Sequence, residues 1–268
     1  MDNYFEELTT PFKTGEARRK ALGRILGFLD LTTLEGIDNQ QRVNALCDKA
    51  LSFKALNLPS PAAVCVYPPF AGLVSERLKG SGIKTAAVAG AFPSGQLPIH
   101  LKVAEVEYAV AEGADEIDMV ISRGTFLAGD YNTIRNEVAE MKKACGIAHL
   151  KVILETGELA SSENVCKASE LAIAGGADFI KTSTGKIQPA ATPEAMAVML
   201  DVIAAHYKSS GLKVGIKPAG GISLPDQALI YYALVHNKLG DEWLNSSLFR
   251  IGASRLADAI VKELTEGV

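Results

Sequence analysis

The chain contains 268 residues, of which 48% are apolar and 22% are charged, and its formal net charge is −4. This composition is typical of a globular chain with a large core and excludes an intrinsically disordered one. The length fits a single α/β barrel of about 250 residues or two small domains. No tract is rich in lysine and arginine, which disfavours a nucleic-acid-binding protein, and any anionic ligand needs local positive charge.

The N-terminal segment and the cysteines bear on where the protein works. The first twenty residues are polar and carry both charge signs, unlike a secretory signal, and no apolar run is long enough to predict a membrane span. The four cysteines (Cys47, Cys65, Cys145 and Cys166) form no CxxC pair, which predicts reduced thiols in a cytoplasmic protein. The histidines form no HExxH or HxH motif; this disfavours a histidine-built metal site and leaves a carboxylate-held ion open.

Short apolar runs alternate with helix-like stretches along the chain, after a polar segment expected to be helical. The predicted strands and their following helices are 28–34 with 41–50, 62–68 with 71–79, 83–90 with 102–112, 115–121 with 132–144, 149–156 with 162–174, 177–183 with 193–206, 212–221 with 226–234, and 248–254 with 255–264. The strands are continuous apolar runs rather than strict alternations, which predicts parallel strands covered on both faces.

Eight strand–helix units without a hinge-like linker predict one α/β domain, a (β/α)8 barrel over 26–268, with a helical extension over 1–25. A doubly wound open sheet is the main alternative, and the lack of a GxGxxG motif after the first strand disfavours it.

Two similar segments, GADEID and GADFIK, lie two units apart. Because alternate strands of such a barrel feed the same interior layers, Asp118 and Lys181 are expected at equivalent positions facing the interior.

Lys181 follows the apolar pair Phe179-Ile180, so its charge is expected to be either neutralised or used. An ordinary lysine has a pKa near 10.4, and only about one in two thousand is neutral at pH 7. Burial and a nearby cation both lower that pKa, and Lys217 at the end of the seventh strand is the expected cation. A single strand-end lysine usually points to solvent, but two of them beside an aspartate at the catalytic edge of a barrel favour a functional role.

Asp118 lies within an apolar strand, where an ionised carboxylate is costly unless it is paired. Pairing with Lys181 and Lys217 would stabilise it, and it could also move protons between carbon, water and nitrogen. A structural ion pair and an acid–base role both stay open for Asp118. The same two interpretations apply to Asp30 in the first strand.

Glycine-rich turns follow the last three predicted strands. They are Gly185-Lys186 after the sixth strand, Gly220-Gly221 after the seventh, and Gly252-Ala253-Ser254 after the eighth. Amides in glycine turns and at helix N-termini bind phosphate oxygens, and the loops after strands seven and eight often do so in this architecture. The sequence therefore predicts a phosphorylated small molecule whose other end reaches Lys181, where a neutral amine could form a Schiff base with a carbonyl.

Seven segments of the chain resemble deoxyribose-phosphate aldolase in its longer form. They are DLTTL (30–34), VCVYP (64–68), GADEIDMV (113–120), KVILETGEL (151–159), GADFIKTSTGK (176–186), VGIKPAGG (214–221) and IGAS (251–254). The segments follow the family's order and span nearly the whole chain. FIKTSTGK and KPAGG together are highly specific.

The resemblance implies a (β/α)8 barrel that cleaves 2-deoxy-D-ribose 5-phosphate reversibly into D-glyceraldehyde 3-phosphate and acetaldehyde, as a class I aldolase without metal or cofactor. It places the Schiff-base lysine at Lys181, the lysine that lowers its pKa at Lys217, and the proton-relay aspartate at Asp118, working with water. It further implies a cytoplasmic homodimer. The implied phosphate and substrate loops contain Gly185, Lys186, Gly220, Gly221, Gly252 and Ser254, and the implied pocket lining includes Asp30 and Cys65.

Two departures from the family pattern concern the phosphate loops. Ile222-Ser223 stands where the family often has Val-Arg, and Arg255 stands where a second serine is common. Arg255 either supplies the charge missing at Ser223 or points away. Two other functions stay open: the same lysine chemistry on another phosphorylated aldose or ketose, and a non-catalytic barrel that binds a sugar phosphate as a sensor.

Overall fold

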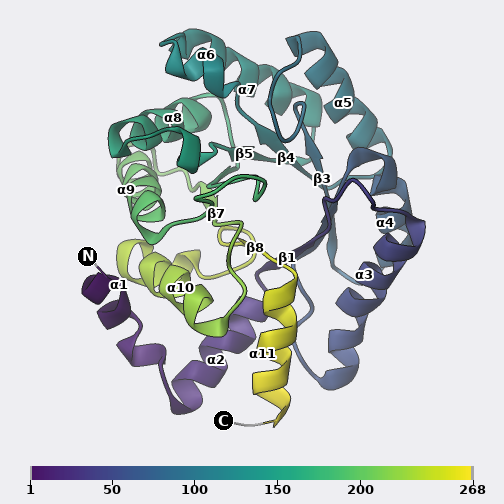
Figure 1. Cartoon of the computed structure of the whole chain (residues 1–268), viewed down its shortest axis with the longest axis vertical. Helices are drawn as coiled ribbons and strands as arrows, with labels where there is room; N and C mark the ends of the chain where they lie inside the picture. Colours follow the sequence, from purple (N-terminus) through teal and green to yellow (C-terminus); the bar gives the residue numbers. More distant parts are fainter. Residues whose placement is uncertain (1, 267–268) are drawn as a thin grey trace.

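The computed structural model describes residues 2–266, and it forms a (β/α)8 barrel with the strands inside a ring of helices (Figure 1). The strands are β1 (Leu29–Thr32), β2 (Ala63–Val66), β3 (Lys84–Ala89), β4 (Glu116–Val120), β5 (His149–Ile153), β6 (Phe179–Lys181), β7 (Gly215–Lys217) and β8 (Ile251–Gly252). Each strand from β1 to β6 pairs in parallel with the next along the chain, and β8 pairs with β1. Bridges from Ile216 to Phe249 and from Ala219 to Gly252 close the ring, so the open-sheet alternative is wrong.

A helix follows every strand, as the sequence predicts. These helices are α3 (Gln40–Ser52), α4 (Ala71–Leu78), α5 (Ile99–Ala111), α7 (Tyr131–Cys145), α8 (Ser162–Ala174), α9 (Pro193–Ser210), α10 (Pro225–Leu239) and α11 (Arg255–Glu266). The sequence did not predict the short helix α6 (Arg123–Leu127) or the 3-10 turns Thr10–Phe12, Phe53–Leu56, Pro68–Phe70, Thr156–Glu158 and Asp241–Trp243. No helix within residues 2–266 is both long and apolar enough to cross a membrane.

Side chains in the preceding loops fix where several helices begin. Asn39, Asp130, Ser161 and Thr192 each accept a hydrogen bond from a backbone amide in the first turn of α3, α7, α8 and α9 respectively. Such N-caps satisfy amides that have no intrahelical partner, and each contributes about 1 kcal/mol.

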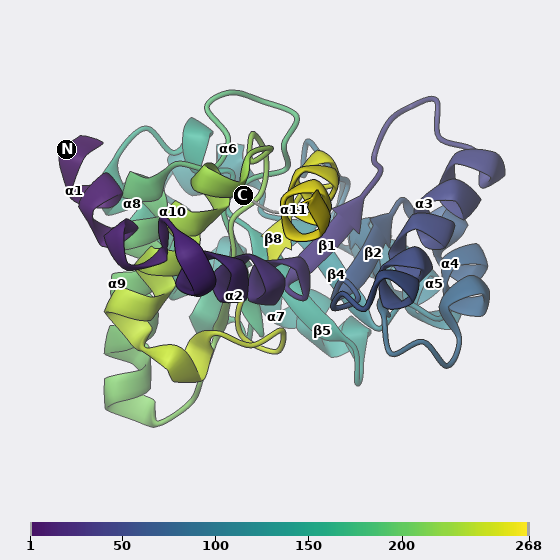
Figure 2. The same cartoon turned by 90° about the horizontal axis from the view of Figure 1, so that it is seen from below.

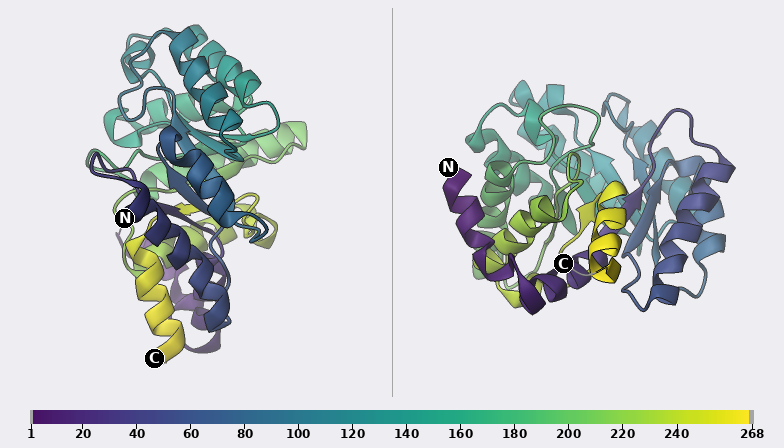
Figure 3. Two further views of the ribbon diagram at one scale, coloured as in Figure 1. Left: turned by 90° about the vertical axis from the view of Figure 1, so that its right-hand side faces the viewer. Right: turned by 60° about the horizontal axis from the view of Figure 1, so that its bottom comes forward.

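The N-terminal segment forms helices α1 (Asp2–Leu8) and α2 (Gly15–Leu26). They run along the outer side of α10 and α11 and appear in purple beside the yellow-green and yellow helices (Figure 2 and Figure 3). One face of α2 is buried, and Arg18 on the same face pairs with Asp226 at 2.6 Å and Glu263 at 2.5 Å. The extension is therefore helical, and it packs on the last two helices of the barrel.

Several strands are shorter than the apolar runs that predict them. The run 177–183 contains a strand only at Phe179–Lys181, and the run 212–221 only at Gly215–Lys217. The chain leaves the ladder after Lys217 at Pro218, which has no amide hydrogen to donate. Thr182 and Ser183 continue the first run, and Pro218 and Ala219 the second, as buried loop rather than strand.

The strand register sets which side chains share a level inside the barrel. Asp118 pairs with Lys151, and Lys151 pairs with Phe179. Strands in this fold are staggered by about one residue per strand, so Lys181 rather than Phe179 lies level with Asp118. The same counting gives three interior layers: Cys65, Asp118, Lys181 and Gly252; then Asp30, Ala86, Lys151 and Lys217; then Ala63, Glu116, Phe179 and Arg250.

Candidate active site

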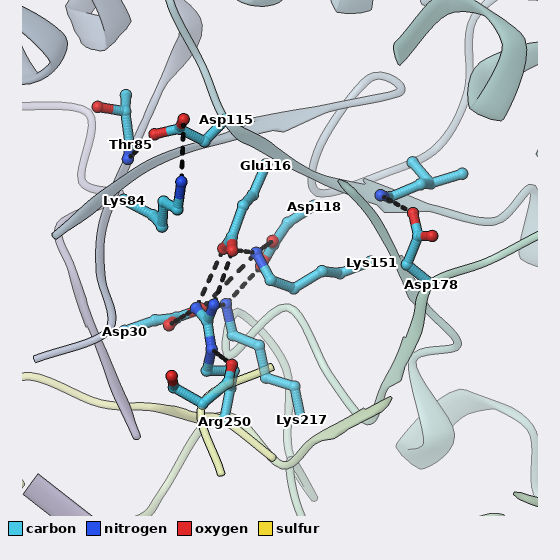
Figure 4. A network of polar contacts seen from close by, with 12 residues as sticks. Asp30, Lys84, Thr85, Asp115, Glu116, Asp118, Lys151, Asp178, Lys217 and Arg250 are labelled. Atoms are coloured by element: carbon cyan, nitrogen blue, oxygen red, sulfur yellow. Dashed lines mark hydrogen bonds and ion pairs between the residues drawn. The ribbon is translucent and has the colours of Figure 1, made fainter. Parts of the chain in front are cut away.

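The barrel interior holds a cluster of charged side chains, called here the interior ion cluster. Its members are Asp30, Glu116, Asp118, Lys151, Lys181, Lys217 and Arg250, all of them buried. Figure 4 shows six of the seven, all except Lys181, pointing toward one another across the barrel. The cluster has four basic and three acidic side chains. One of the four cations is therefore in excess of the carboxylates. Because an unpaired charge is costly in a buried interior, one basic side chain is expected to hold its proton weakly.

Lys217 is paired more strongly than Lys181 within the cluster. Its Nζ lies 2.5 Å from Asp30 Oδ2 and 2.7 Å from Asp118 Oδ2. Burial alone would lower the pKa of Lys217, but the negative charges of Asp118 and Asp30 outweigh burial and raise it. Lys217 therefore stays protonated and acts as a fixed positive charge.

Lys181 has a weaker hold on its proton. Its Nζ lies 2.7 Å from Asp118 Oδ2, the same oxygen that Lys217 contacts. Burial is the largest influence and lowers the pKa of Lys181; the charge of Lys217 lowers it further, and together they outweigh Asp118. Lys181 is thus the cation in excess, and it becomes neutral at a lower pH than an ordinary lysine.

The lower part of the cluster was not predicted from the sequence. Lys151 Nζ lies 3.0 Å from Asp118 Oδ1 and 2.6 Å from Glu116 Oε2. Arg250 binds both carboxylate oxygens of Glu116, at 2.7 and 3.1 Å, and Asp30 Oδ1 at 2.7 Å. These contacts hold both aspartates in place from below. The available signal was a charged residue inside an apolar run, as in KVIL and FRIG.

Asp118 lies between the lysines as an ionised carboxylate. Burial alone would raise the pKa of Asp118, but Lys151, Lys181 and Lys217 hold it well below its usual value. One oxygen faces Lys151, and the other bridges Lys181 and Lys217. A carboxylate that bridges a neutralisable amine and a fixed cation can accept and pass on protons during a reaction.

A cavity of about 250 Å³ opens above Lys181, at the carboxyl ends of the strands. Its lining includes all six loop residues expected to bind phosphate, namely Gly185, Lys186, Gly220, Gly221, Gly252 and Ser254. Within residues 2–266, the amides of Gly185, Gly220 and Gly221 donate to no protein group. All three glycines have positive φ (81°, 86° and 81°), a conformation that lets successive amides converge on an anion.

Two basic side chains supplement these amides. Lys186 Nζ lies 3.0 Å from Glu35 Oε1 across the cavity mouth, so an entering anion would compete with Glu35 for this lysine. Ser223 and Arg255 line the same cavity, and Arg255 is the first residue of α11. Of the two alternatives for Arg255, this placement favours the one in which it supplies the charge missing at Ser223. The N-terminus of α11 adds to the positive potential.

Three residues expected at the pocket, Ser254, Asp30 and Cys65, are surrounded by other protein groups. The Ser254 hydroxyl accepts from Thr32 N at 2.7 Å and donates to Thr32 O at 2.6 Å, so it ties β8 to β1. Asp30 is fully buried within the interior ion cluster, and Cys65 is fully buried in the barrel; neither is part of the cavity lining. Burial and the nearby Asp118 raise the pKa of the Cys65 thiol to about 11, so it stays protonated.

Two other features of the structure bear on the location of the site. A larger groove of about 970 Å³ runs between α8 and α9, but none of the candidate site residues lines it. Across residues 2–266, no group of three or more His, Cys, Asp and Glu side chains is arranged to hold a metal ion. The smaller cavity above Lys181 is therefore the candidate active site, because a buried lysine with a lowered pKa and backbone amides without protein acceptors meet there.

The fold and the site together define a barrel enzyme suited to carbonyl chemistry on an anionic substrate. The model of the DeoC/LacD family aldolases matches residues 25–238. The chain is 46% identical over 249 residues to the deoxyribose-phosphate aldolase of Mus musculus, covering 88% of this chain and 78% of that one. It is 41% identical over 251 residues to the deoxyribose-phosphate aldolase of Agrobacterium fabrum, covering 93% of each.

Among solved structures, the deoxyribose phosphate aldolase of Aeropyrum pernix matches with a TM-score of 0.75 over 100% of both chains. At 20% identity, that likeness concerns the fold alone. The chain belongs to the DeoC/LacD aldolase family, and it is an aldolase, a carbon–carbon lyase.

Proposed function

We propose that the protein reversibly cleaves 2-deoxy-D-ribose 5-phosphate into D-glyceraldehyde 3-phosphate and acetaldehyde through a Schiff base on Lys181. The observation that carries the proposal is the position of Lys181, a buried amine with a lowered pKa on the wall of a small anion-binding cavity. The curated relatives named above as deoxyribose-phosphate aldolases support the same substrate.

In the proposed mechanism, the neutral amine of Lys181 attacks the aldehyde carbon C1 of the open-chain sugar. Loss of water gives an iminium ion, which draws electrons from C2. A base removes the proton of the C3 hydroxyl, the C2–C3 bond breaks, and its electron pair moves to C2 as an enamine. C3 then leaves as the aldehyde of glyceraldehyde 3-phosphate. Protonation of C2 and addition of water release acetaldehyde and restore the lysine.

Each part of the site has a role in this sequence. Asp118, with water, moves the protons, because it is ionised and contacts Lys181 directly. Lys217 keeps a positive charge beside Lys181 and so favours the neutral amine. The free amides, with Lys186 and Arg255, hold the phosphate on C5.

Two alternatives are less well supported. A sensor that binds a sugar phosphate has no need of an amine with a lowered pKa beside a buried carboxylate, and this site has both. The same chemistry on another phosphorylated aldose or ketose is distinguished by comparing acceptor aldehydes in the synthetic direction. Glyceraldehyde 3-phosphate is expected to be the best acceptor, and a different preferred phosphorylated acceptor would replace the proposed substrate.

Borohydride reduction in the presence of 2-deoxyribose 5-phosphate tests the proposal directly. We expect a stable adduct that peptide mass spectrometry locates on Lys181, because reduction traps the iminium ion. The Lys181→Met variant is expected to give no adduct, whereas Lys186→Met keeps the adduct and needs more substrate to form it. A folded protein that binds inorganic phosphate and forms no adduct would rule out the Schiff-base mechanism.

The proposal extends to the state of the protein: a cytoplasmic homodimer that works without a cofactor. All four cysteines are free thiols, and three of them are buried, which suits a reducing compartment. Light scattering after size-exclusion chromatography tests the dimer, and a monomer mass at working concentrations would contradict it.

A further inference from the structure

The end of β5 carries a buried carboxylate, Glu155, that the proposed chemistry does not use. Glu155 is fully buried and has a left-handed backbone, with φ 57° and ψ 59°. A non-glycine residue keeps such a conformation only where its surroundings require it, and such residues gather at functional sites. On either side of it, Leu154 N donates to Lys181 O at 2.9 Å and Thr156 N donates to Thr182 O at 3.0 Å. Glu155 is thereby fixed relative to the lysine strand.

The Glu155 side chain reaches across to the loop that follows β6. Its Oε1 accepts from Thr184 N at 3.1 Å, and its Oε2 accepts from the Thr184 hydroxyl. The same hydroxyl oxygen accepts from Lys186 N at 3.1 Å. The nearest cation is Arg123, at 3.9 Å. One carboxylate therefore holds Thr184 by both its backbone and its side chain, and Thr184 in turn holds Lys186.

These contacts enclose a turn that lines the cavity. Gly185, between Thr184 and Lys186, has φ 81° and a free amide, and all three residues line the cavity beside Lys181. A glycine turn has many accessible conformations, so its amide and the lysine head group face the anion only if something fixes the turn. Hydrogen bonds to a buried charge are strong enough to do this.

We propose that Glu155 is a positioning residue that sets the distance between the anion-binding turn (Thr184 to Lys186) and the reactive amine of Lys181. The inference rests on the proposed function, because its effect is defined by a substrate with a phosphate at one end and an aldehyde at the other. Glu155 does not touch the reacting atoms. Its contribution is therefore specific to substrates that carry the phosphate.

The test compares two substrates, 2-deoxyribose 5-phosphate and unphosphorylated 2-deoxyribose, in the Glu155→Gln variant. The substitution keeps the shape but removes the charge that organises Thr184. We expect kcat/KM for the phosphorylated sugar to fall roughly tenfold to a hundredfold, the range for losing a hydrogen bond to a charged group. The value for the unphosphorylated sugar is expected to stay unchanged, because Lys181 and Asp118 keep their contacts.

Glu158→Gln is the matched control. Glu158 also pairs with Arg123, from a half-exposed position in the same loop, and makes no contact with Thr184. We expect it to leave both substrates unaffected. An equal loss on both substrates in Glu155→Gln would show a general structural role, and no loss on either would show no role; both results overturn the inference.

Thr184 offers a second way to break the same contact, should Glu155→Gln fail to fold. Thr184→Val removes the hydroxyl and is expected to show the same selective loss, whereas Thr184→Ser keeps the hydroxyl and is expected to restore the wild-type ratio of the two substrates. A ratio that stays at the wild-type value in Thr184→Val would overturn the inference.

Two binding measurements separate this inference from the proposed function. Trapping of acetaldehyde by borohydride is expected to label Lys181 equally in wild type and Glu155→Gln. If wild type forms no adduct, the proposed function fails, and the affinity for inorganic phosphate then decides the positioning role by itself. We expect weaker phosphate binding in Glu155→Gln and an unchanged affinity in Glu158→Gln, and equal affinities in all three proteins would overturn it.

Discussion

A Lys217→Met variant is expected to lose most of its activity at pH 7 and to regain it as the pH rises. In wild type, Lys217 and Lys181 share one oxygen of Asp118, and the cluster has one cation in excess. Without Lys217, three cations face three carboxylates, and Lys181 alone contacts that oxygen. The protonated form of Lys181 is then stabilised. Each unit by which the pKa of Lys181 rises lowers its neutral fraction at pH 7 by up to tenfold, so the expected loss is roughly tenfold or more.

The measurement is kcat/KM from about pH 6 to about pH 10, a range that ends near the ordinary lysine pKa. The Lys217→Met profile is expected to rise toward high pH, because deprotonation of Lys181 restores the nucleophile. Lys217→Arg keeps the positive charge, so its profile is expected to resemble that of wild type. A Lys217→Met profile that is low but has the wild-type pH dependence would show that Lys217 acts by some means other than the protonation of Lys181.

The Lys181→Met variant removes the nucleophile itself, whereas Lys217→Met leaves the amine in place and changes its protonation. It is expected to be inactive at every pH, because no amine remains to attack the aldehyde. The stability of this variant provides a control, because the direction of its change follows from the lowered pKa of Lys181. A lysine whose folded pKa is lowered binds protons more weakly in the native state than in the unfolded chain, so it destabilises the fold until the pH passes its unfolded value. Lys181→Met is therefore expected to resist urea better than wild type at pH 7.

The sequence predicts the architecture because eight apolar runs and the helices after them are local patterns. Once those runs are parallel strands in a barrel, their carboxyl ends meet at one edge. Lys181 and Lys217 could be brought together in this way without knowledge of any distance. The layer that contains Asp118 and Lys181 follows from the similarity of GADEID and GADFIK. These inferences needed only the order of the strands and the alternation of their faces.

The order of the strands is not enough to predict the contacts of Lys151, Glu116 and Arg250 or the contact between Glu155 and Thr184. Glu116 lies two residues before Asp118, so the alternation of a strand already places it on the same face. Its partner Arg250 comes immediately before β8, whose short ladder the apolar pattern does not delimit. Which cation meets which carboxylate depends on the register of all eight strands. Glu155 was hidden for another reason: its orientation follows from a left-handed backbone that no sequence pattern around it indicates.

Removal of Arg250 is expected to be the most destabilising change in the interior ion cluster. Its guanidinium is buried and binds Glu116 through two nitrogens and Asp30 through one. Arg250→Met removes the partner that these two carboxylates share, and it leaves Glu116 with Lys151 as its remaining cation. Breaking a buried ion pair from one side costs about 3–5 kcal/mol, so the free energy of unfolding in urea should fall by that amount at neutral pH.

Two comparisons test whether the lost charge pairing, rather than lost packing, causes this effect. Arg250→Met combined with Glu116→Gln is expected to recover part of the stability, because it removes a buried carboxylate that has lost its arginine. Arg42→Met is expected to change stability by less than about 1 kcal/mol, because the Arg42 side chain is half-exposed in its pair with Asp38. A double variant no more stable than the single one would attribute the loss to packing.

The pH dependence of the Arg250→Met defect provides a second, independent check on its cause. Burial alone would raise the pKa of Glu116, but Lys151 and Arg250 lower it below its usual value. A carboxylate with a lowered pKa stabilises the fold fully above its unfolded pKa of about 4.3, and this stabilisation is lost as the pH falls through the lower, folded value. Wild type therefore loses part of its advantage over Arg250→Met in acid. A stability difference that stays constant from neutral to acidic pH would contradict an electrostatic origin, since lost packing does not titrate.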